Sequence, residues 1–402
     1  MELERRLPDQ SYRWVVVGYT LITQAVALGV MFYSFALFAV PWLDLFNAPR
    51  RDVMLIGSLL QFGVGVFSPL VGRMMDRYPM YWVIYAGLAL LLLGLLLGSQ
   101  ATALWQLQLL YATVFPFSMA LMGTLAAQTL ITRWFDEQRG LAIGISATGT
   151  NLGGIVFPML VASGLALIGW RQTFVLLAVI SLILVGPLTW LVLRRSPPAP
   201  APGTTGEHLD GRLWSTREIL SSSLFWLPVI CIMPMMIAFG AVQLNIGALA
   251  GDLGFGADVA ARLLAVAAVC MVLGKFFFGS MGDRLDHRLL FWIALGCMSA
   301  AMVILQLDAS LWMLTMGVIA LGLAGGGLLP LLGLIFGARF GVASFGRVMG
   351  LVMLSLTVGA TGPLLAGWIY DATGSYDSAF MLFLVLFVPT GIAMRWLRPP
   401  GG

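Results

Sequence analysis

Twelve apolar runs, each close to the length of a membrane-spanning helix, are the feature that most limits how this sequence can fold. A span needs about 20 consecutive, mostly apolar residues. In hydrocarbon every backbone N–H and C=O must be hydrogen-bonded within the protein, and the alternating pattern of a membrane β-barrel is absent. The runs cover residues 14–42, 53–72, 80–98, 104–132, 140–165, 169–193, 221–250, 257–280, 289–306, 310–336, 346–369 and 376–394. The sequence therefore predicts an all-α membrane protein with twelve spans.

The composition excludes an ordinary soluble domain. Of the 402 residues, 60% are hydrophobic and 10% are charged, whereas soluble domains are about 25% charged. The first 13 residues are polar and lead directly into the first apolar run, so we expect no cleaved signal peptide. The three cysteines lie far apart in apolar runs, and His208 and His287 fall in polar loops. We therefore expect no disulfide frame, no metal site and no cofactor.

The arginines are distributed unevenly between the two sides of the membrane. With the N-terminus inside, 17 arginines fall on the cytoplasmic side and 4 on the outer side. Cytoplasmic loops carry the excess of basic residues in membrane proteins. We therefore predict a multi-pass protein of the plasma (inner) membrane with both termini in the cytoplasm. Because this asymmetry accounts for the net charge of +4, the charge does not call for a nucleic-acid partner.

A polar segment at 194–220 divides the chain into two parts. Its Pro, Gly and Ser content is typical of a linker. Six apolar runs lie on each side of it. We therefore predict an N-terminal six-span bundle at 1–193, a cytoplasmic linker at 194–220 and a C-terminal six-span bundle at 221–402.

The two halves share a loop motif. Segment 72–77 follows the second apolar run, and segment 279–284 follows the eighth. Asp76 recurs as Asp283, 207 residues later, and the glycine that begins each segment has the same offset. Such a repeat predicts two parallel six-helix halves related by a pseudo-two-fold axis along the membrane normal.

Segment 72–77 resembles the G-x-x-x-D-R loop motif of the major facilitator superfamily, and segment 279–284 resembles its second copy. The resemblance extends over nearly the whole chain and implies the twelve-span major facilitator fold. Two further segments, 133–144 and 362–371, resemble the branch of monocarboxylate transporters and oxalate/formate antiporters. The resemblance implies a secondary active transporter that works by alternating access, with substrate bound near mid-membrane between the halves. We expect the chain to act as a monomer surrounded by membrane lipid.

The repeated loop motifs are candidate gates. Asp76 and Asp283 stand at the cytoplasmic ends of spans, where each carboxylate could accept from the following arginine or face a neighbouring helix N-terminus. Such contacts would hold the cytoplasmic side shut and release as it opens. The alternative is that the Asp-Arg pairs only end a helix in the headgroup region. The gating candidates are Gly72, Asp76, Arg77, Gly279, Asp283, Arg284, Arg139 and Arg347.

Lys275 is the only lysine and the only charged residue clearly inside an apolar run. A charge at this depth costs about 2.5–3.5 kcal/mol on insertion scales and usually faces a cavity or a partner. Since no acidic residue lies at that depth, an anionic substrate is a candidate partner. The alternative is that the side chain, about 12 Å before Asp283 along a helix, reaches the headgroups. The resemblance implies a substrate-binding cation at this position, usually Arg; a lysine binds as a point charge and can also release a proton.

Polar and aromatic side chains in other spans are further candidates. A buried polar group must find a partner, and a hydrogen bond between helices can supply one as well as a substrate can. The superfamily fold implies that the first, fourth and seventh spans line the cavity, which favours Tyr33, Tyr111 and Asn245. The candidate substrate-binding residues are Lys275, Tyr33, Tyr111, Asn245, Gln243 and Asn151.

These observations favour transport of a small organic anion, a monocarboxylate such as lactate or pyruvate, with protons as the candidate coupling ion. Two positions depart from the proton-coupled subgroup of the resembled branch: Leu37 stands in place of a lysine and Met271 in place of an acid. Anion exchange, or export of larger aromatic or hydrophobic acids, therefore stays open. The enzyme motifs H-E-x-x-H, G-x-S-x-G and the P-loop are absent, which disfavours an enzyme. A receptor is disfavoured because no loop is long enough for an output domain.

Overall fold

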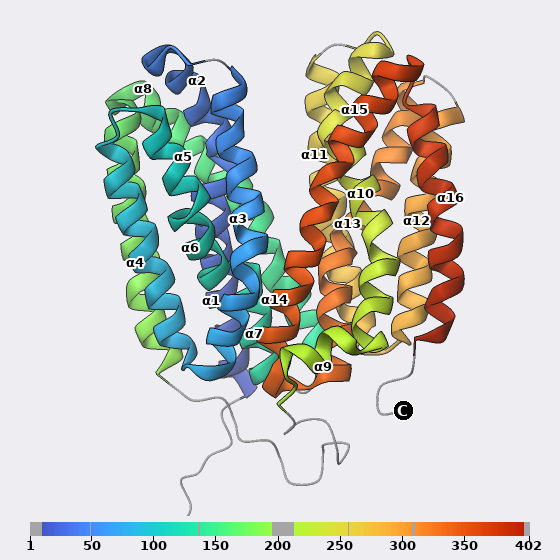
Figure 1. Cartoon of the computed structure of the whole chain (residues 1–402), viewed down its shortest axis with the longest axis horizontal. Coiled ribbons are helices and arrows are strands. Elements are labelled where there is room, and N and C mark those ends of the chain that lie inside the picture. Colours follow the sequence, from blue (N-terminus) through green and yellow to red (C-terminus); the bar gives the residue numbers. More distant parts are fainter. Residues whose placement is uncertain are drawn as a thin grey trace, which may run out of the picture. The chain divides into compact units, whose positions relative to one another are not determined.

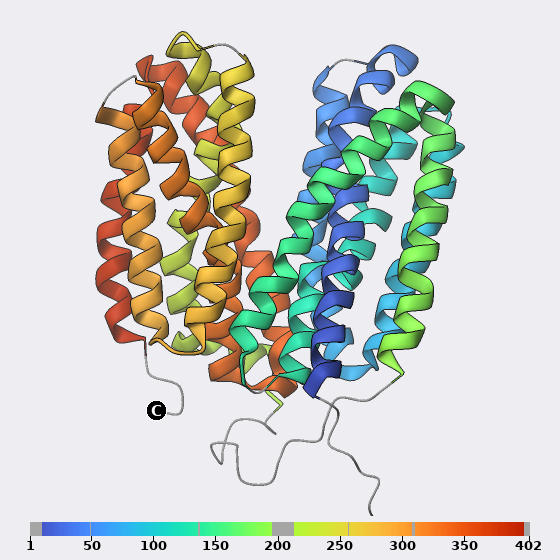
Figure 2. The ribbon, with the colours of Figure 1, turned by 180° about the vertical axis from the view of Figure 1, so that it is seen from behind.

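The computed structural model describes residues 10–48, 50–135, 137–194, 213–255, 257–307 and 310–397, and these residues are helical throughout apart from short turns (Figures 1 and 2). The helices of the first part of the chain are α1 (Gln10–Leu28), η1 (Gly29–Tyr33), α2 (Phe35–Phe46), α3 (Arg50–Arg77), α4 (Met80–Ser99), α5 (Leu104–Ala112), α6 (Val114–Met122), α7 (Thr124–Trp134) and α8 (Arg139–Leu193). Those of the second part are α9 (Thr216–Ser221), α10 (Ser223–Asp252), α11 (Ala257–Gly282), α12 (His287–Leu307), α13 (Leu311–Phe340), η2 (Val342–Ser344), α14 (Phe345–Leu356), η3 (Thr357–Thr361), α15 (Gly362–Thr373), α16 (Asp377–Ala393) and η4 (Met394–Trp396).

The long helix α8 joins two of the predicted spans. Its 55 residues would measure about 80 Å as one straight helix, more than twice the roughly 30 Å of a hydrocarbon core. At Gly169 the backbone leaves the helical region, with φ at 77°, a conformation that glycine adopts without steric cost. Among the described residues, 11 helices are long and apolar enough to cross a membrane. Because α8 turns at Gly169, they supply the twelve predicted spans.

The chain forms two compact units. The first takes the described residues of Met1–Glu137, Ile145–Leu213 and Phe340–Leu354. The second takes Gln138–Gly144, Trp214–Arg339 and the described part of Ser355–Gly402. Segment 138–144 thus belongs to the second unit and segment 340–354 to the first, whereas the prediction placed them in the halves 1–193 and 221–402, respectively. The exact boundaries of the halves stay a prediction.

Of the predicted linker at 194–220, residues 195–212 lie outside the described part of the chain. The described end of the linker begins α9 with a capping box. The Ser215 hydroxyl accepts the Glu218 N–H at 3.2 Å, and the Glu218 carboxylate accepts the Ser215 N–H at 2.7 Å. This reciprocal pairing satisfies two amides at the start of the helix.

Small residues and buried amides hold the helices of each unit together. In the first unit, Gln24 on α1 donates to the carbonyl and the hydroxyl of Ser146 on α8, at 2.9 and 2.7 Å. One turn away from this hydrogen bond, Gly149 on α8 packs directly on the backbone of Leu21 on α1. In the second unit, Gly274 on α11 packs on the backbone of α13. Side chains at such positions would separate the helices, as expected for glycines that mediate close helix packing in membranes.

Candidate functional site

Lys275 lies on α11 in the second unit and is 6% exposed. Its backbone carbonyl packs against Gly144, at the end of the first turns of α8 that join this unit. The preceding residue, Gly274, packs on the carbonyl of Leu323 in α13. Because only 6% of the residue is exposed, the side chain is enclosed by protein. This enclosure disfavours the alternative in which the ammonium group reaches into the headgroup region.

Gln243 on α10 lies against the face of α11 that carries Lys275. Its amide nitrogen donates to the sulfur of Met271 at 3.8 Å. Met271 stands one turn before Lys275 and therefore on the same helical face. Gln243 is half-buried. Through the contact with Met271, two predicted residues of the second unit, Gln243 and Lys275, lie in one neighbourhood.

Asn245, two residues further along α10, makes contacts within the helix bundle. Its amide nitrogen donates to the carbonyl of Ala241 in its own helix at 2.8 Å and to the carbonyl of Pro363 in α15 at 3.5 Å. The contact with Pro363 is the helix–helix hydrogen bonding that the sequence left open as an alternative. It favours a role in positioning α10 against α15.

Tyr33 stands at the end of η1, a single π-helical turn between α1 and α2. Its ring lies over Gly154 of α8, where an added Cβ would come within 3.3 Å of the ring. It also packs edge-on against Phe32, with ring centroids 5.1 Å apart. π-helical turns inside α-helices occur frequently at functional sites, and apolar periodicity did not predict this one.

Tyr111 on α5 is 2% exposed and lies in an aromatic core of the first unit. Its ring is 4.7 Å from that of Phe115, 6.0 Å from Phe35 and 6.1 Å from Trp42. This packing leaves the ring little surface for a ligand. Asn151 on α8 is half-buried and accepts the hydroxyl of Thr150 at 3.2 Å.

Asp76 closes the N-terminus of a helix. The carboxylate accepts the N–H groups of Gly346 at 3.1 Å and Arg347 at 2.9 Å, in the first turn of α14, and its side chain is 2% exposed. Arg133 on α7 places a guanidinium nitrogen 3.9 Å from the same carboxylate. Gly72, one turn earlier, packs on the backbone of Gly346. All of these residues belong to the first unit.

Asp283 makes the equivalent contact in the second unit. Its two oxygens accept the N–H groups of Gly140 at 2.8 Å and Leu141 at 3.1 Å, in the first turn of α8. Gly279 packs on the backbone of Gly140, as Gly72 does on Gly346. A carboxylate at a helix N-terminus satisfies unpaired amides and faces the positive end of the helix dipole. The repeat seen in the sequence is therefore a repeat of two helix caps.

Four predicted arginines surround these caps. Arg77 and Arg284, which follow the aspartates, are exposed, and the aspartates accept from backbone amides of other helices. The sequence left two partners open for each aspartate, the following arginine or a neighbouring helix N-terminus. The structure shows the helix N-terminus. Arg139 begins α8 and is half-buried, and Arg347 contributes its backbone N–H to Asp76. The ion pair of Arg133 with Asp76 was not predicted; a basic residue ending the fourth apolar run was its only signal.

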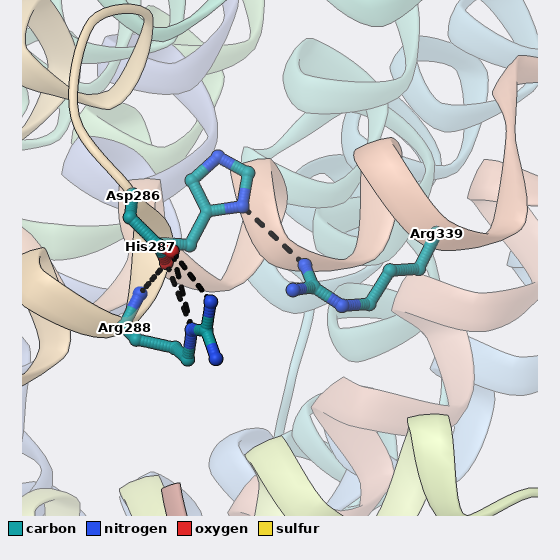
Figure 3. Close-up of polar contacts among 4 residues, drawn as sticks. All are labelled: Asp286, His287, Arg288 and Arg339. Carbon is teal, nitrogen blue, oxygen red and sulfur yellow. Dashed lines mark hydrogen bonds and ion pairs between the residues drawn. The ribbon is translucent and has the colours of Figure 1, made fainter. Parts of the chain in front are cut away.

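A polar cluster lies at the turn between α11 and α12 (Figure 3). Arg288 donates to both oxygens of Asp286, at 3.2 and 2.9 Å, and this hydrogen bonding holds the pKa of the Asp286 carboxyl below its usual range. His287 is not surrounded by solvent, since its Nδ1 lies 3.3 Å from a guanidinium nitrogen of Arg339. Within the described residues no group of three metal-ligating side chains is present, and His208 lies outside those residues.

Comparisons with known proteins identify the family. Residues 21–246 and 229–402 match the model of the Major Facilitator Superfamily. The chain therefore belongs to this superfamily, and it is a multi-pass membrane transport protein and not an enzyme. The predicted fold class, an all-α protein with the twelve-span major facilitator fold, is confirmed.

Two sets of similar proteins refine the picture. Monocarboxylate transporter 13 of Bos taurus is 28% identical over 93% of this chain and 87% of its own length. Monocarboxylate transporter 11 of Homo sapiens is 27% identical over 93% of this chain and 80% of its own length. The structure resembles the E. coli fucose:proton symporter, with a TM-score of 0.70, 17% identity and coverage of 96% and 98%. It also resembles the human organic anion transporter MFSD10, with a TM-score of 0.73, 16% identity and coverage of 97% and 100%.

Proposed function

We propose that the chain is a secondary active transporter of a small organic anion of the monocarboxylate class. The observation that carries this proposal is Lys275, a buried cation on a helix that is long and apolar enough to span a membrane. A charge at that depth is retained where it meets a ligand or an opposite charge. The similarity to proteins named monocarboxylate transporters, over 93% of the chain, supports the same class of substrate.

Lys275 would recognise the carboxylate as a point charge. An ammonium group offers three rotatable donors, whereas an arginine would offer a planar fork that matches a carboxylate in one orientation. A lysine site therefore tolerates carboxylates presented at different angles. Gln243, on the adjacent face of α10, would add a hydrogen bond to the same anion. Tyr33 and Asn151 are the further lining residues that we propose in the first unit.

Asn245 and Tyr111 stay in the proposed site as positioning residues. The Asn245 amide bridges α10 and α15, and the Tyr111 ring fixes α5 within the aromatic core. Neither residue needs to contact substrate to matter for transport. Their substitution would then disturb expression or stability together with uptake, whereas substitution of Lys275 would disturb uptake alone.

In this proposal the two aspartate caps act as gates of alternating access. Each carboxylate holds the N-terminus of a helix that comes from the opposite half of the sequence. We propose that these caps hold the cytoplasmic side shut and release as it opens. We further propose proton symport, with both termini in the cytoplasm and the plasma (inner) membrane as location.

The experiment that tests the function is uptake of labelled lactate, pyruvate, formate and oxalate into proteoliposomes containing the purified chain. Each anion is offered with and without an inward proton gradient, and into vesicles preloaded with a second anion. We expect uptake of a monocarboxylate that increases with the gradient. Uptake that requires preloading would replace symport by exchange, and absence of uptake of all four would overturn the proposed substrate class.

A further inference from the structure

The second unit carries a hollow between α12 and α16 that the transport mechanism does not use. It has a volume of about 600 Å³, within the range of roughly 300–1,000 Å³ typical of ligand pockets. Trp292 and Ser299 line it from α12, and Phe387 and Val388 from α16, with Arg395 at one end. The two helices lie side by side in Figures 1 and 2. The hollow is therefore an apolar groove with a basic residue at its mouth.

A hydrogen bond keeps the two helices together beside the groove. The indole N–H of Trp292 donates to the carbonyl of Gly391 at 3.0 Å. A Cβ on Gly391 would come within 3.0 Å of the Leu295 side chain, so the glycine allows α16 to approach α12 at this level. The groove is thus bounded by a fixed contact near the ends of the helices and is not a loose gap between them.

The first unit contains a smaller version of the same arrangement. The Tyr85 hydroxyl on α4 donates to the carbonyl of Gly186 on α8 at 3.0 Å. Trp292 follows Tyr85 by 207 residues, the same offset that separates Asp76 from Asp283. The matching groove, with Arg194 at its end, measures about 290 Å³.

The two grooves differ at their mouths. In the first unit Arg194 is exposed, and its guanidinium stacks over the ring of Trp190, 4.2 Å from the ring centroid. In the second unit Arg395 is exposed in η4, directly after α16, and no described acidic residue forms an ion pair with it. The second groove therefore combines the larger volume with an exposed cation that, among the described residues, stacks on no aromatic ring.

The surroundings of Arg395 are those of a lipid-facing surface. Val388 is 62% exposed and the neighbouring Trp396 is 72% exposed. In a membrane protein such apolar side chains face acyl chains, and tryptophan is enriched at the level of the headgroups. Arg288 lies one turn before Trp292 on α12, but it is paired with Asp286, so Arg395 is the cation of the groove. The charge at the mouth is complementary to a phosphate, and the groove below it to an acyl chain.

We propose that the groove between α12 and α16 binds one anionic phospholipid, with its phosphate at Arg395 and an acyl chain along Phe387 and Val388. A zwitterionic lipid carries a cation next to its phosphate, which Arg395 repels. Each basic residue near a membrane surface contributes about 1 kcal/mol to binding of anionic lipid. Loss of Arg395 is therefore expected to weaken binding about fivefold. This site is separate from the proposed substrate site at Lys275.

The test is native mass spectrometry of the full chain, purified in detergent and titrated with dioleoylphosphatidylglycerol or dioleoylphosphatidylcholine. We expect retention of one phosphatidylglycerol and weaker retention of phosphatidylcholine. Arg395→Gln should lower phosphatidylglycerol retention about fivefold and leave phosphatidylcholine unchanged. Val388→Trp, which fills the groove, should lower retention of both lipids.

Arg194→Gln is the matched control, because it removes the arginine of the smaller groove, and it should retain phosphatidylglycerol like the parent. Because Val388 and Arg395 are exposed, we expect their variants to fold like the parent. Equal thermal unfolding temperatures without added lipid would establish this. Equal phosphatidylglycerol retention by Arg395→Gln and Arg194→Gln would overturn the headgroup assignment. Unchanged retention in Val388→Trp would overturn the groove itself.

Discussion

Replacement of Asp76 by asparagine would keep the shape of the side chain while removing its charge. The parent carboxylate accepts two backbone N–H groups, those of Gly346 and Arg347, and faces the guanidinium of Arg133. Asparagine keeps one acceptor oxygen and introduces an amide nitrogen that cannot accept. One N–H of α14 would then lose its partner in a place where the side chain is 2% exposed.

The cost can be worked from these contacts. A hydrogen bond to a charged group contributes about 1.5–3 kcal/mol, and the loss of one such bond sets the scale for Asp76→Asn. Asp283 caps α8 with the same two-amide geometry but is exposed. Water can replace the lost acceptor there, so Asp283→Asn should cost about 1 kcal/mol or less, the lower range for a helix cap.

Thermal unfolding of the two variants in detergent, followed by tryptophan fluorescence at one scan rate, would measure this difference. With about 2–4 °C per kcal/mol for a unit of this size, we expect Asp76→Asn to unfold roughly 3–12 °C below the parent. Asp283→Asn should stay within about 4 °C of it. Equal shifts, or a larger shift for Asp283→Asn, would refute the argument from burial.

Two further predictions concern stability. Gly274→Ala should destabilise the protein by about 1–3 kcal/mol, because the new Cβ meets the backbone of Leu323. Gly296→Ala on α12 should stabilise the protein slightly, because nothing lies within 4 Å of the new Cβ. Thermal unfolding temperatures of the two variants check both predictions. Arg288 lowers the pKa of Asp286, so this pair stabilises the protein above the unfolded pKa of the carboxyl, and the contribution is lost as pH falls through the lower folded value. Since Asp286 is 47% exposed, Asp286→Asn should cost less than about 1 kcal/mol at pH 7 and nothing near pH 2; a constant difference between these pH values would contradict the assignment.

Several features were readable from the sequence because local chemistry determines them. Apolar runs of this length predict membrane spans directly, because in lipid each run must form a helix that satisfies its own backbone hydrogen bonds. The run boundary at 165–169 coincides with the turn at Gly169. The repeat of Asp76 as Asp283 predicted two equivalent contacts, and both aspartates cap a helix in the structure.

Other features depend on residues that are distant in the chain. The amide partner of Asp76 lies 270 residues away and that of Asp283 lies 143 residues away, so no local pattern could name them. Tyr111 and Asn245 look alike in sequence as polar groups in apolar spans, yet one lies in an aromatic core and the other bridges two helices. The Trp292–Gly391 contact had a signal in the 207-residue offset from Tyr85, but the hydrogen bond itself required the structure.

The most direct measurement of the central claim is initial uptake of a labelled monocarboxylate by Lys275→Gln, Lys275→Arg and the parent in proteoliposomes of equal protein content. Arg262→Gln, which removes an exposed cation from the same helix, is the matched control. We predict loss of uptake in Lys275→Gln, parental uptake in Arg262→Gln, and retained uptake with an altered pH profile in Lys275→Arg. Uptake by Lys275→Gln with the kinetics of the parent would contradict the assignment of Lys275 as the anion-binding residue.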